Sequence, residues 1–281
     1  MICAWKQLVS ILPPAIRQEV DRLGRETAQE IRLRMGQKTE VVLSSDSRWL
    51  EHTAEEADLR FVINTASQYS PWASATMAEG YITAAGGHRI GICGIGVTQN
   101  GVMTGIRRIQ SVCIRVARDF PNLAERLPWG DHSVLILGPP GSGKTTLLRD
   151  LIRRISERGQ GSVSVVDERA ELFPETGGFS RGRRTDVLSG CPKPQGILTA
   201  LKTMGPAWIA VDEITAQEDC HALMQAAWCG VRLLATAHAA DKKDLLRRSI
   251  YKPLAECGLF ETLIVLNRDK SWKVERMCQC Q

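Results

Sequence analysis

The sequence predicts an α/β domain with a mostly parallel sheet, preceded by a smaller α+β domain. Its 281 residues exceed one average domain and suggest two. In the C-terminal half, continuous apolar runs alternate with helical stretches, which is typical of parallel strands covered on both faces. In the N-terminal half, short β-rich runs are separated by Gly-Gly and Asn-Gly, the turn signals of antiparallel hairpins. We therefore expect a first domain over 1–120, a proline-containing linker over 121–131 and a second domain over 132–281.

The predicted first domain mixes helices and strands. Residues 13–34 open with Pro-Pro and carry apolar residues among charges, which indicates one or two amphipathic helices. Residues 39–43 are a short strand candidate, and residues 55–69 space their apolar positions for a helix face. Residues 79–118 are expected to form the antiparallel hairpins.

The predicted second domain alternates strands with helices. A helix is expected over 145–158, closed by Gly159. The expected strands are 133–137, 163–166, 208–211, 233–236 and 263–266. This order favours a sheet whose carboxyl edge gathers the loops that follow the strands.

Composition limits the class of protein. Hydrophobic residues make up 43% and charged residues 24%, which is ordinary for a chain that buries a core. The net charge of +5 permits contact with an anionic surface but predicts none. The nine scattered cysteines lack metal-like spacing and favour a reducing, cytoplasmic setting, with a CxC at Cys278 and Cys280. No signal peptide or membrane span is expected, so any membrane association would be peripheral.

A phosphate-binding loop is the clearest motif. Its glycines let backbone amides turn toward phosphate oxygens, and the following helix points its N-terminus at the same anion. The lysine supplies a cation for the β- and γ-phosphates of ATP, and the next hydroxyl binds Mg²⁺. The predicted nucleotide-binding residues are Gly138, Pro139, Pro140, Gly141, Ser142, Gly143, Lys144, Thr145 and Thr146.

An acidic pair follows the third predicted strand of the second domain. Asp212 and Glu213 come directly after Trp208-Ile209-Ala210-Val211. A carboxylate at the carboxyl end of such a strand faces the ligand crevice of an open α/β sheet. Asp212 is expected to hold Mg²⁺ through water, and Glu213 to orient or deprotonate the attacking water.

Two further strand exits carry candidate residues. Asp167, Glu168 and Glu171 follow the second strand, and either enter the same crevice or form an acidic exit from the strand. His238 follows the fourth strand, and its imidazole or the Thr236 hydroxyl could sense a γ-phosphate; the alternative is a structural histidine.

The first domain is rich in arginine. A γ-phosphate in transfer needs compensating positive charge, which an arginine from another subunit can supply. The candidates for this role are Arg89, Arg107, Arg108, Arg115 and Arg118.

Taken together, these blocks resemble the secretion-type traffic ATPases, which carry a P-loop, an acidic box, a Walker B glutamate and a histidine box in this order. More closely, the chain is similar to the stage III sporulation AA family of endospore-forming bacteria. The similarity rests on Gly86-Gly87-His88-Arg89, Ile114-Arg115-Val116-Ala117-Arg118, Val166-Asp167-Glu168-Arg169, Arg184-Thr185-Asp186-Val187-Leu188, Cys191-Pro192-Lys193, Val211-Asp212-Glu213-Ile214 and Thr236-Ala237-His238-Ala239, besides the P-loop.

The resemblance implies a RecA-like P-loop core and a ring, as a homohexamer, with nucleotide between subunits. It implies a mother-cell protein that energises or assembles the channel to the forespore, with membrane proteins of that complex as partners. Glu213 would be the catalytic carboxylate, His238 the histidine-box residue, and Arg89, Arg115 and Arg118 trans-acting fingers. Asp167, Glu168 and Glu171 would form the acidic box, with Asp167 a further metal ligand. Because Arg169 stands where the wider family has proline, either Glu168 or Glu171 can match the acidic-box glutamate.

Two alternatives stay open. A nucleic-acid-dependent RecA-like ATPase would share the same core, but aromatic residues total only 5% and no basic stripe interleaved with them is apparent, so no nucleic acid is expected. A non-catalytic, nucleotide-gated scaffold would also keep a P-loop.

Overall fold

The computed structural model describes residues 1–67, 77, 80–128, 130–159, 161–174 and 178–277. These residues form two compact units. The first comprises Met1–Asp119 with Pro174–Phe179, and the second comprises Phe120–Phe173 with Ser180–Gln281. The cysteines of the CxC and the last two residues of the helix expected over 55–69 lie outside the described residues.

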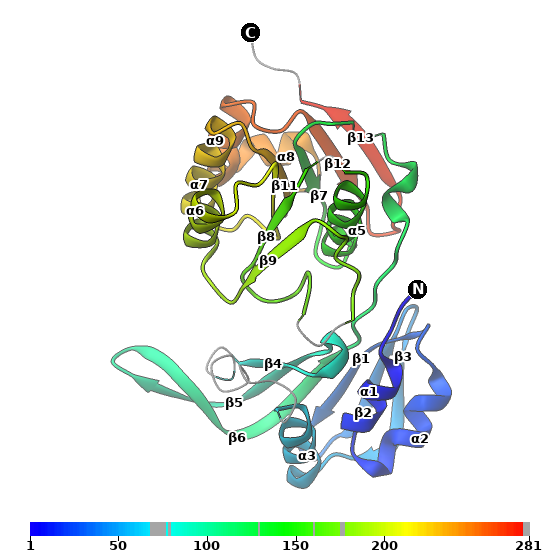
Figure 1. Ribbon diagram of the computed structural model, residues 1–281. Helices are drawn as coiled ribbons and strands as arrows, with labels where there is room; N and C mark the ends of the chain where they lie inside the picture. Colours follow the sequence, from blue (N-terminus) through cyan, green and yellow to red (C-terminus); the bar gives the residue numbers. More distant parts are fainter. Residues whose placement is uncertain (68–76, 78–79, 129, 160, 175–177, 278–281) are drawn as a thin grey trace. The chain divides into compact units, whose positions relative to one another are not determined.

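The first unit is an antiparallel sheet packed against helices (Figure 1). Its strands are ordered β3-β2-β1-β6-β5-β4, and every neighbouring pair is antiparallel. The helices are α1 (Trp5–Ile11), α2 (Pro14–Leu23) and α3 (Glu56–Ser67), and the strands are β1 (Ala28–Arg34), β2 (Lys38–Leu43), β3 (Ser47–Thr53), β4 (Tyr81–Thr83), β5 (Arg89–Gln99) and β6 (Val102–Arg115). Residues of α1, α2 and α3 share one core with the strands.

The turn chemistry of this unit agrees with the sequence in one place and departs from it in another. Asn100 and Gly101 join β5 to β6 with positive φ angles of 52° and 78°, as a tight hairpin requires. The helical interpretation of 13–34 is wrong beyond Leu23, because Gly24 ends α2 with a φ of 80° and residues 28–34 form β1. Ile31 and Leu33 are buried at the two-residue spacing of a strand.

His88 fastens the N-terminal segment to the end of β6. The buried imidazole accepts a hydrogen bond at Nδ1 from the Ala117 amide at 3.0 Å, which leaves Nε2 to donate to the Ala4 carbonyl at 3.0 Å. Burial lowers the pKa of His88 to about 4. A Cβ at Gly86 would lie 2.4 Å from the Cβ of Ala4, so glycine is needed for this close approach.

The second unit is a seven-stranded sheet ordered β13-β12-β7-β11-β10-β8-β9. All pairs are parallel except β12 with β13. The strands are β7 (Val134–Leu137), β8 (Val163–Asp167), β9 (Thr185–Ser189), β10 (Trp208–Val211), β11 (Arg232–Ala237), β12 (Thr262–Leu266) and β13 (Trp272–Arg276). The α/β fold class with its mostly parallel sheet is confirmed, and the strands β7, β8, β10, β11 and β12 lie where their apolar runs were found.

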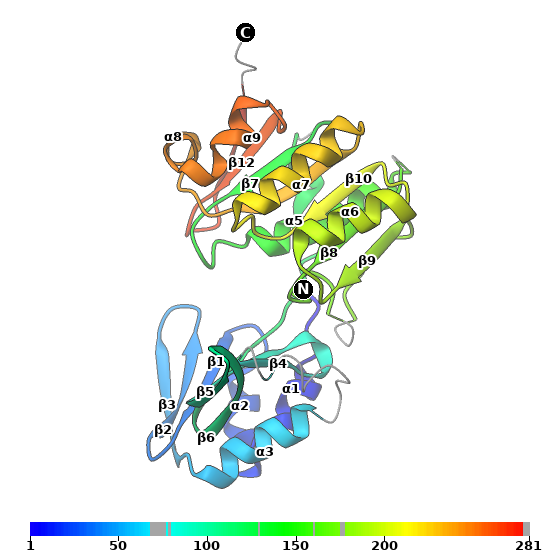
Figure 2. The same cartoon turned by 90° about the vertical axis from the view of Figure 1, so that its left-hand side faces the viewer.

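Helices cover both faces of this sheet (Figures 1 and 2). Residues of α6 (Lys193–Thr203), α7 (Gln217–Trp228), α8 (Lys242–Arg247) and α9 (Lys252–Glu256) share one core with Leu135 and Leu137 of β7. The helix α5 (Lys144–Glu157) follows β7 and lies on the other face. The order β7-β11-β10-β8 therefore brings four strand exits to one edge, beside the N-terminus of α5.

The segment 121–131, expected as a linker, belongs to the second unit. It contains the short 3₁₀ turn Leu123–Arg126, and the amides of Asn122 and Ala124 donate to the two carboxylate oxygens of Asp150 at 2.9 and 2.8 Å. The side chain of Asp150 is buried in α5, so these bonds fix the segment on the unit that it opens. Among the described residues, no helix is long and apolar enough to cross a bilayer.

Candidate nucleotide site

The P-loop connects β7 to α5 through residues with unusual backbone angles. Gly138, Gly141 and Gly143 have φ angles of 159°, 73° and 100°. A Cβ at Gly138 would lie 2.6 Å from the Ser142 hydroxyl and 2.8 Å from the Leu266 carbonyl, so any larger residue would fill the turn. Gly143 caps α5, which begins at Lys144 and directs its free amides toward the loop.

Lys144 begins a chain of hydrogen bonds that reaches the acidic pair. Its ammonium group donates to the carbonyls of Gly138 and Pro139 at 3.0 and 3.2 Å and lies 3.0 Å from Nδ1 of His238. Nε2 of His238 lies 2.7 Å from the Glu213 carboxylate. Because the ammonium group can only donate, Nδ1 of His238 accepts from it, and Nε2 donates to the Glu213 carboxylate. Burial lowers the pKa of Lys144, while the negative charges of Glu213 and Asp212 act in the opposite direction.

Asp212 joins the carboxyl end of β10 to the P-loop helix. One carboxylate oxygen accepts from the Thr145 hydroxyl at 2.7 Å, and the other accepts from the Thr236 hydroxyl at 2.7 Å. The Thr236 oxygen in turn accepts from the Glu213 amide at 2.8 Å. Thr236 is fully buried, so its hydroxyl holds both acidic residues in place from the neighbouring strand β11.

Glu213 has a left-handed backbone conformation, with a φ of 55°. This conformation costs a non-glycine residue about 1–2 kcal/mol. The hydrogen bond of its amide to Thr236 and the bond of the next amide, Ile214, to the Thr236 carbonyl at 2.9 Å maintain it. The turn directs the Glu213 carboxylate toward His238. Strained backbone conformations of this kind occur often at functional sites.

Asp167 organises the loop that follows β8. Its carboxylate accepts from the amides of Glu171, Leu172 and Phe173 at 2.9, 3.0 and 2.9 Å. Burial raises the pKa of Asp167 to about 6, against the lowering effect of the Phe173 and Leu172 amides. From α5, Arg149 donates to the carbonyls of Leu172 and Glu171 at 2.5 and 2.8 Å. These contacts give Asp167 a clear structural role, and its binding of a metal stays a prediction.

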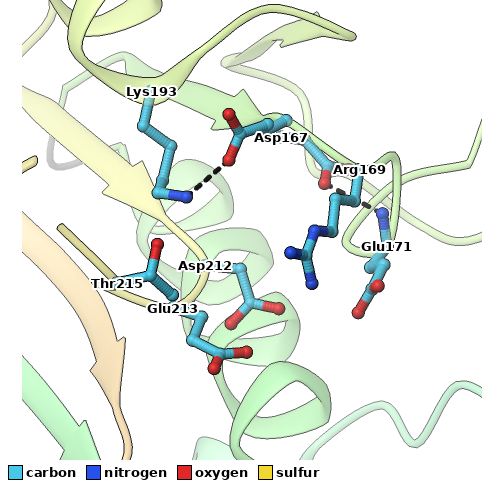
Figure 3. Close-up of a pocket in the computed structure, with 8 residues that line it drawn as sticks. Asp167, Arg169, Glu171, Lys193, Asp212, Glu213 and Thr215 are labelled. Atoms are coloured by element: carbon cyan, nitrogen blue, oxygen red, sulfur yellow. Dashed lines mark hydrogen bonds and ion pairs between the residues drawn. The ribbon is translucent and has the colours of Figure 1, made fainter. Parts of the chain in front are cut away.

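The acidic groups line one pocket (Figure 3). It is bounded by Asp167, Glu168, Arg169, Glu171, Lys193, Asp212, Glu213 and Thr215. The dashed line at Lys193 in Figure 3 marks its ion pair with Glu168, at 2.5 Å. The pocket therefore joins the acidic residues after β8 to the acidic pair after β10, which sequence spacing alone did not establish.

Sequence reasoning missed three residues of this region. Lys193 and Arg149 are buried cations. Lys193 belongs to the Cys191-Pro192-Lys193 block but was given no role at the site, and the only signal for Arg149 was a basic residue inside a helix. Lys270, in the turn between β12 and β13, donates to the Gly141 carbonyl and so contacts the P-loop from a distant part of the chain.

The three arginines proposed as trans-acting fingers lie in the first unit. Arg89 stacks on the Tyr81 ring at 4.2 Å, and Arg115 lies opposite Arg89 in the sheet, 3.3 Å from the Glu30 carboxylate. Arg118 donates to the backbone carbonyls of Arg25 and Ala28. These contacts bind Arg118 to its own unit, whereas the Arg115 side chain is 63% exposed.

Solved structures share this fold. The chain matches the ATPase DotB of Yersinia pseudotuberculosis with a TM-score of 0.61, at 17% identity, over 92% of this chain and 76% of that one. It matches the pilus retraction motor PilT, solved with bound ADP, with a TM-score of 0.62, at 16% identity, over 89% and 76%. The fold is that of the secretion and traffic ATPases, as the sequence predicted.

Sequence comparison then gives the family. Residues 4–276 match the family described as Sporulation stage III, protein AA. The stage III sporulation protein AA of Bacillus subtilis (strain 168) is 32% identical over 94% of this chain and 91% of its own length. The chain belongs to this family. Protein SEEDLING PLASTID DEVELOPMENT 1 of Arabidopsis thaliana is 26% identical over 85% of this chain, which spans only 34% of that protein.

Proposed function

We propose that this chain binds Mg·ATP at its P-loop and hydrolyses it. The observation that carries this proposal is the meeting of two hydrogen-bonded paths at one sheet edge. One runs from Lys144 through His238 to Glu213, and the other joins Thr145 to Asp212. In this proposal, the groups that would bind phosphate, hold a cation and activate water therefore lie in contact with one another.

Each residue has a definite task in this proposal. Lys144 neutralises the β- and γ-phosphates, and its bonds to its own loop carbonyls keep the ammonium group at the turn. Thr145 and Asp212 would hold Mg²⁺, which supplies positive charge for the phosphate oxygens. Glu213 accepts the proton of the attacking water, and His238 fixes the orientation of its carboxylate.

The P-loop itself fits a phosphate group. The Ser142 hydroxyl is 2% exposed and has no hydrogen-bond partner among the described residues. A buried polar atom of this kind normally has a partner, so its position inside the turn favours an anion ligand. The glycine at 138 keeps the space beside this hydroxyl free of a side chain.

Phosphate release from Mg·ATP tests the proposal. We expect Lys144→Ala to abolish hydrolysis and to weaken nucleotide binding, because it removes the cation of the loop. Glu213→Gln should keep nucleotide binding and lose hydrolysis, since the amide cannot accept the water proton. Lys202→Ala, at an exposed lysine of α6, is the matched control and should behave as wild type.

If wild type and Lys144→Ala released phosphate at the same background rate, the proposal of hydrolysis would be contradicted. A nucleotide-gated scaffold would then be the remaining interpretation. Salt-sensitive stimulation by single-stranded DNA would instead favour the nucleic-acid-dependent ATPase.

We further infer a homohexameric ring in the mother-cell cytoplasm, peripheral to the membrane, that energises or assembles the channel complex of the developing spore. The family membership and the fold shared with traffic ATPases support this inference. In such a ring, Arg89, Arg115 or Arg118 would act on the nucleotide of a neighbouring subunit.

Nucleotide-dependent assembly, measured by light scattering, tests the ring. Recovery of sporulation membrane proteins in a pull-down tests the partners, and recovery of nucleic-acid machinery instead would contradict them.

A further inference from the structure

Lys193 occupies a place that its own helix disfavours. It is the first residue of α6, where aligned peptide dipoles favour an anion over a cation. Its side chain is also only 7% exposed, and lysine is almost never buried without a partner. The burial of a charged lysine at this position is therefore explained by its neighbours in the pocket and not by the helix.

The partners of Lys193 come from two different segments, the loop after β8 and the first turn of α7. Its ammonium group lies 2.5 Å from the Glu168 carboxylate, after β8, and 3.7 Å from the Asp219 carboxylate, in the first turn of α7. Asp219 accepts from the amides of Thr215 and Ala216 at 2.9 and 3.1 Å. Through Asp219, the lysine therefore reaches the loop that directly follows Asp212 and Glu213.

The pocket beside Lys193 is lined mainly by negatively charged side chains. Five of the eight residues around it carry a carboxylate: Asp167, Glu168, Glu171, Asp212 and Glu213. The two cations are Lys193 and Arg169, and Arg169 is exposed. Lys193 is thus the buried positive charge among the residues around the pocket (Figure 3). Loss of its charge would leave the repulsion between these carboxylates less compensated.

We propose that Lys193 is a positioning residue of this site: it holds the Glu168 carboxylate and the loop after Asp212–Glu213 in fixed places beside the P-loop. The proposal rests on the proposed ATPase function for its catalytic consequence. Its structural part, the link between the two acidic loops, is independent of hydrolysis.

Lys193→Met tests the catalytic consequence, because it keeps the stem and removes the charge. We expect kcat for ATP hydrolysis to fall roughly 10–100-fold, as for a misplaced catalytic group. The dissociation constant of ADP should change by less than about twofold, since the P-loop and Lys144 are untouched. Lys193→Arg should restore part of kcat because the guanidinium can still bond the carboxylates. In a Glu168→Gln background, Lys193→Met should lower kcat by a smaller factor than in wild type, because only the contact with Asp219 remains to be lost. Lys202→Met, on the same helix, is the control and should change neither quantity.

Hydrogen–deuterium exchange tests the link itself, without nucleotide. Lys193→Met should accelerate exchange in 168–173 and in 213–219 while leaving α5 unchanged. If wild type releases no phosphate, the proposed function fails, and the exchange result still decides whether the lysine links the loops. Unchanged exchange together with unchanged kcat would overturn the proposal. A parallel loss of ADP binding, global stability and kcat would overturn it in favour of a general packing role.

Discussion

The Thr236 hydroxyl offers a sharp test of how the acidic pair is held. Thr236→Val replaces the hydroxyl by a methyl group of similar volume at a fully buried position. The substitution removes the bond to Asp212 at 2.7 Å and leaves the Glu213 amide, at 2.8 Å, without its acceptor. It therefore separates hydrogen bonding from packing.

The magnitude follows from these two bonds. An unsatisfied buried donor costs about 1–3 kcal/mol, and a hydrogen bond to a charged group contributes about 1.5–3 kcal/mol. Asp212 is half-buried and keeps its bond to Thr145, so water can replace part of the lost contact. We therefore expect a total loss of about 2–4 kcal/mol in the unfolding free energy of the second unit. Thr236→Ser keeps the hydroxyl and loses one methyl group, which costs about 1 kcal/mol.

The assay must report on the second unit alone, because a chain of two units need not unfold in one step. Denaturant-dependent hydrogen exchange of peptides from β10 and β11 gives that free energy. ATP hydrolysis should fall in Thr236→Val and persist in Thr236→Ser. A valine variant as stable and as active as the serine variant would refute the reasoning that this hydroxyl holds the pair.

Three further predictions concern stability. Burial raises the folded-state pKa of Asp167 to about 6 from 3.8, so ionisation of this carboxyl opposes folding. The unfolding free energy of the second unit should therefore fall by roughly 3 kcal/mol as the pH rises from about 4 to 6. Asp167→Asn should abolish this pH dependence in unfolding titrations. His88 should give the opposite pH dependence, because burial lowers its folded-state pKa to about 4 from 6.5. The unfolding free energy of the first unit should fall by roughly 3 kcal/mol as the pH falls from about 6.5 to 4. Hydrogen exchange in β5 and β6 measures this change, which should be absent in His88→Gln. A Cβ at Gly196 would lie 2.5 Å from the Val166 side chain, so Gly196→Ala should lower the unfolding free energy of the second unit by about 1–3 kcal/mol, whereas Gly105→Ala, where nothing lies within 4 Å, should not destabilise the first.

Local sequence patterns determined the central elements and the motifs at their ends. The strands β7, β8, β10, β11 and β12 are mostly apolar runs, because both faces of a parallel sheet are buried; Ser164 and Thr236 are buried polar exceptions. The Asn100-Gly101 turn and the P-loop could also be predicted from the sequence, because their positive φ angles exclude most other residues. The edge strands β3, β9 and β13 were missed because they expose most of their side chains and therefore lack an apolar pattern.

Only the tertiary structure decided which of the candidate residues meet. The sequence placed acids after two strands, but the pairing of β11 with β10 made Thr236 the neighbour of Asp212. The tertiary structure also brought Lys193 to Glu168, and Lys270 to the P-loop. The physical reason is that burial periodicity is encoded within a few residues, whereas the pairing of charges depends on strand order and helix packing between residues far apart in the chain.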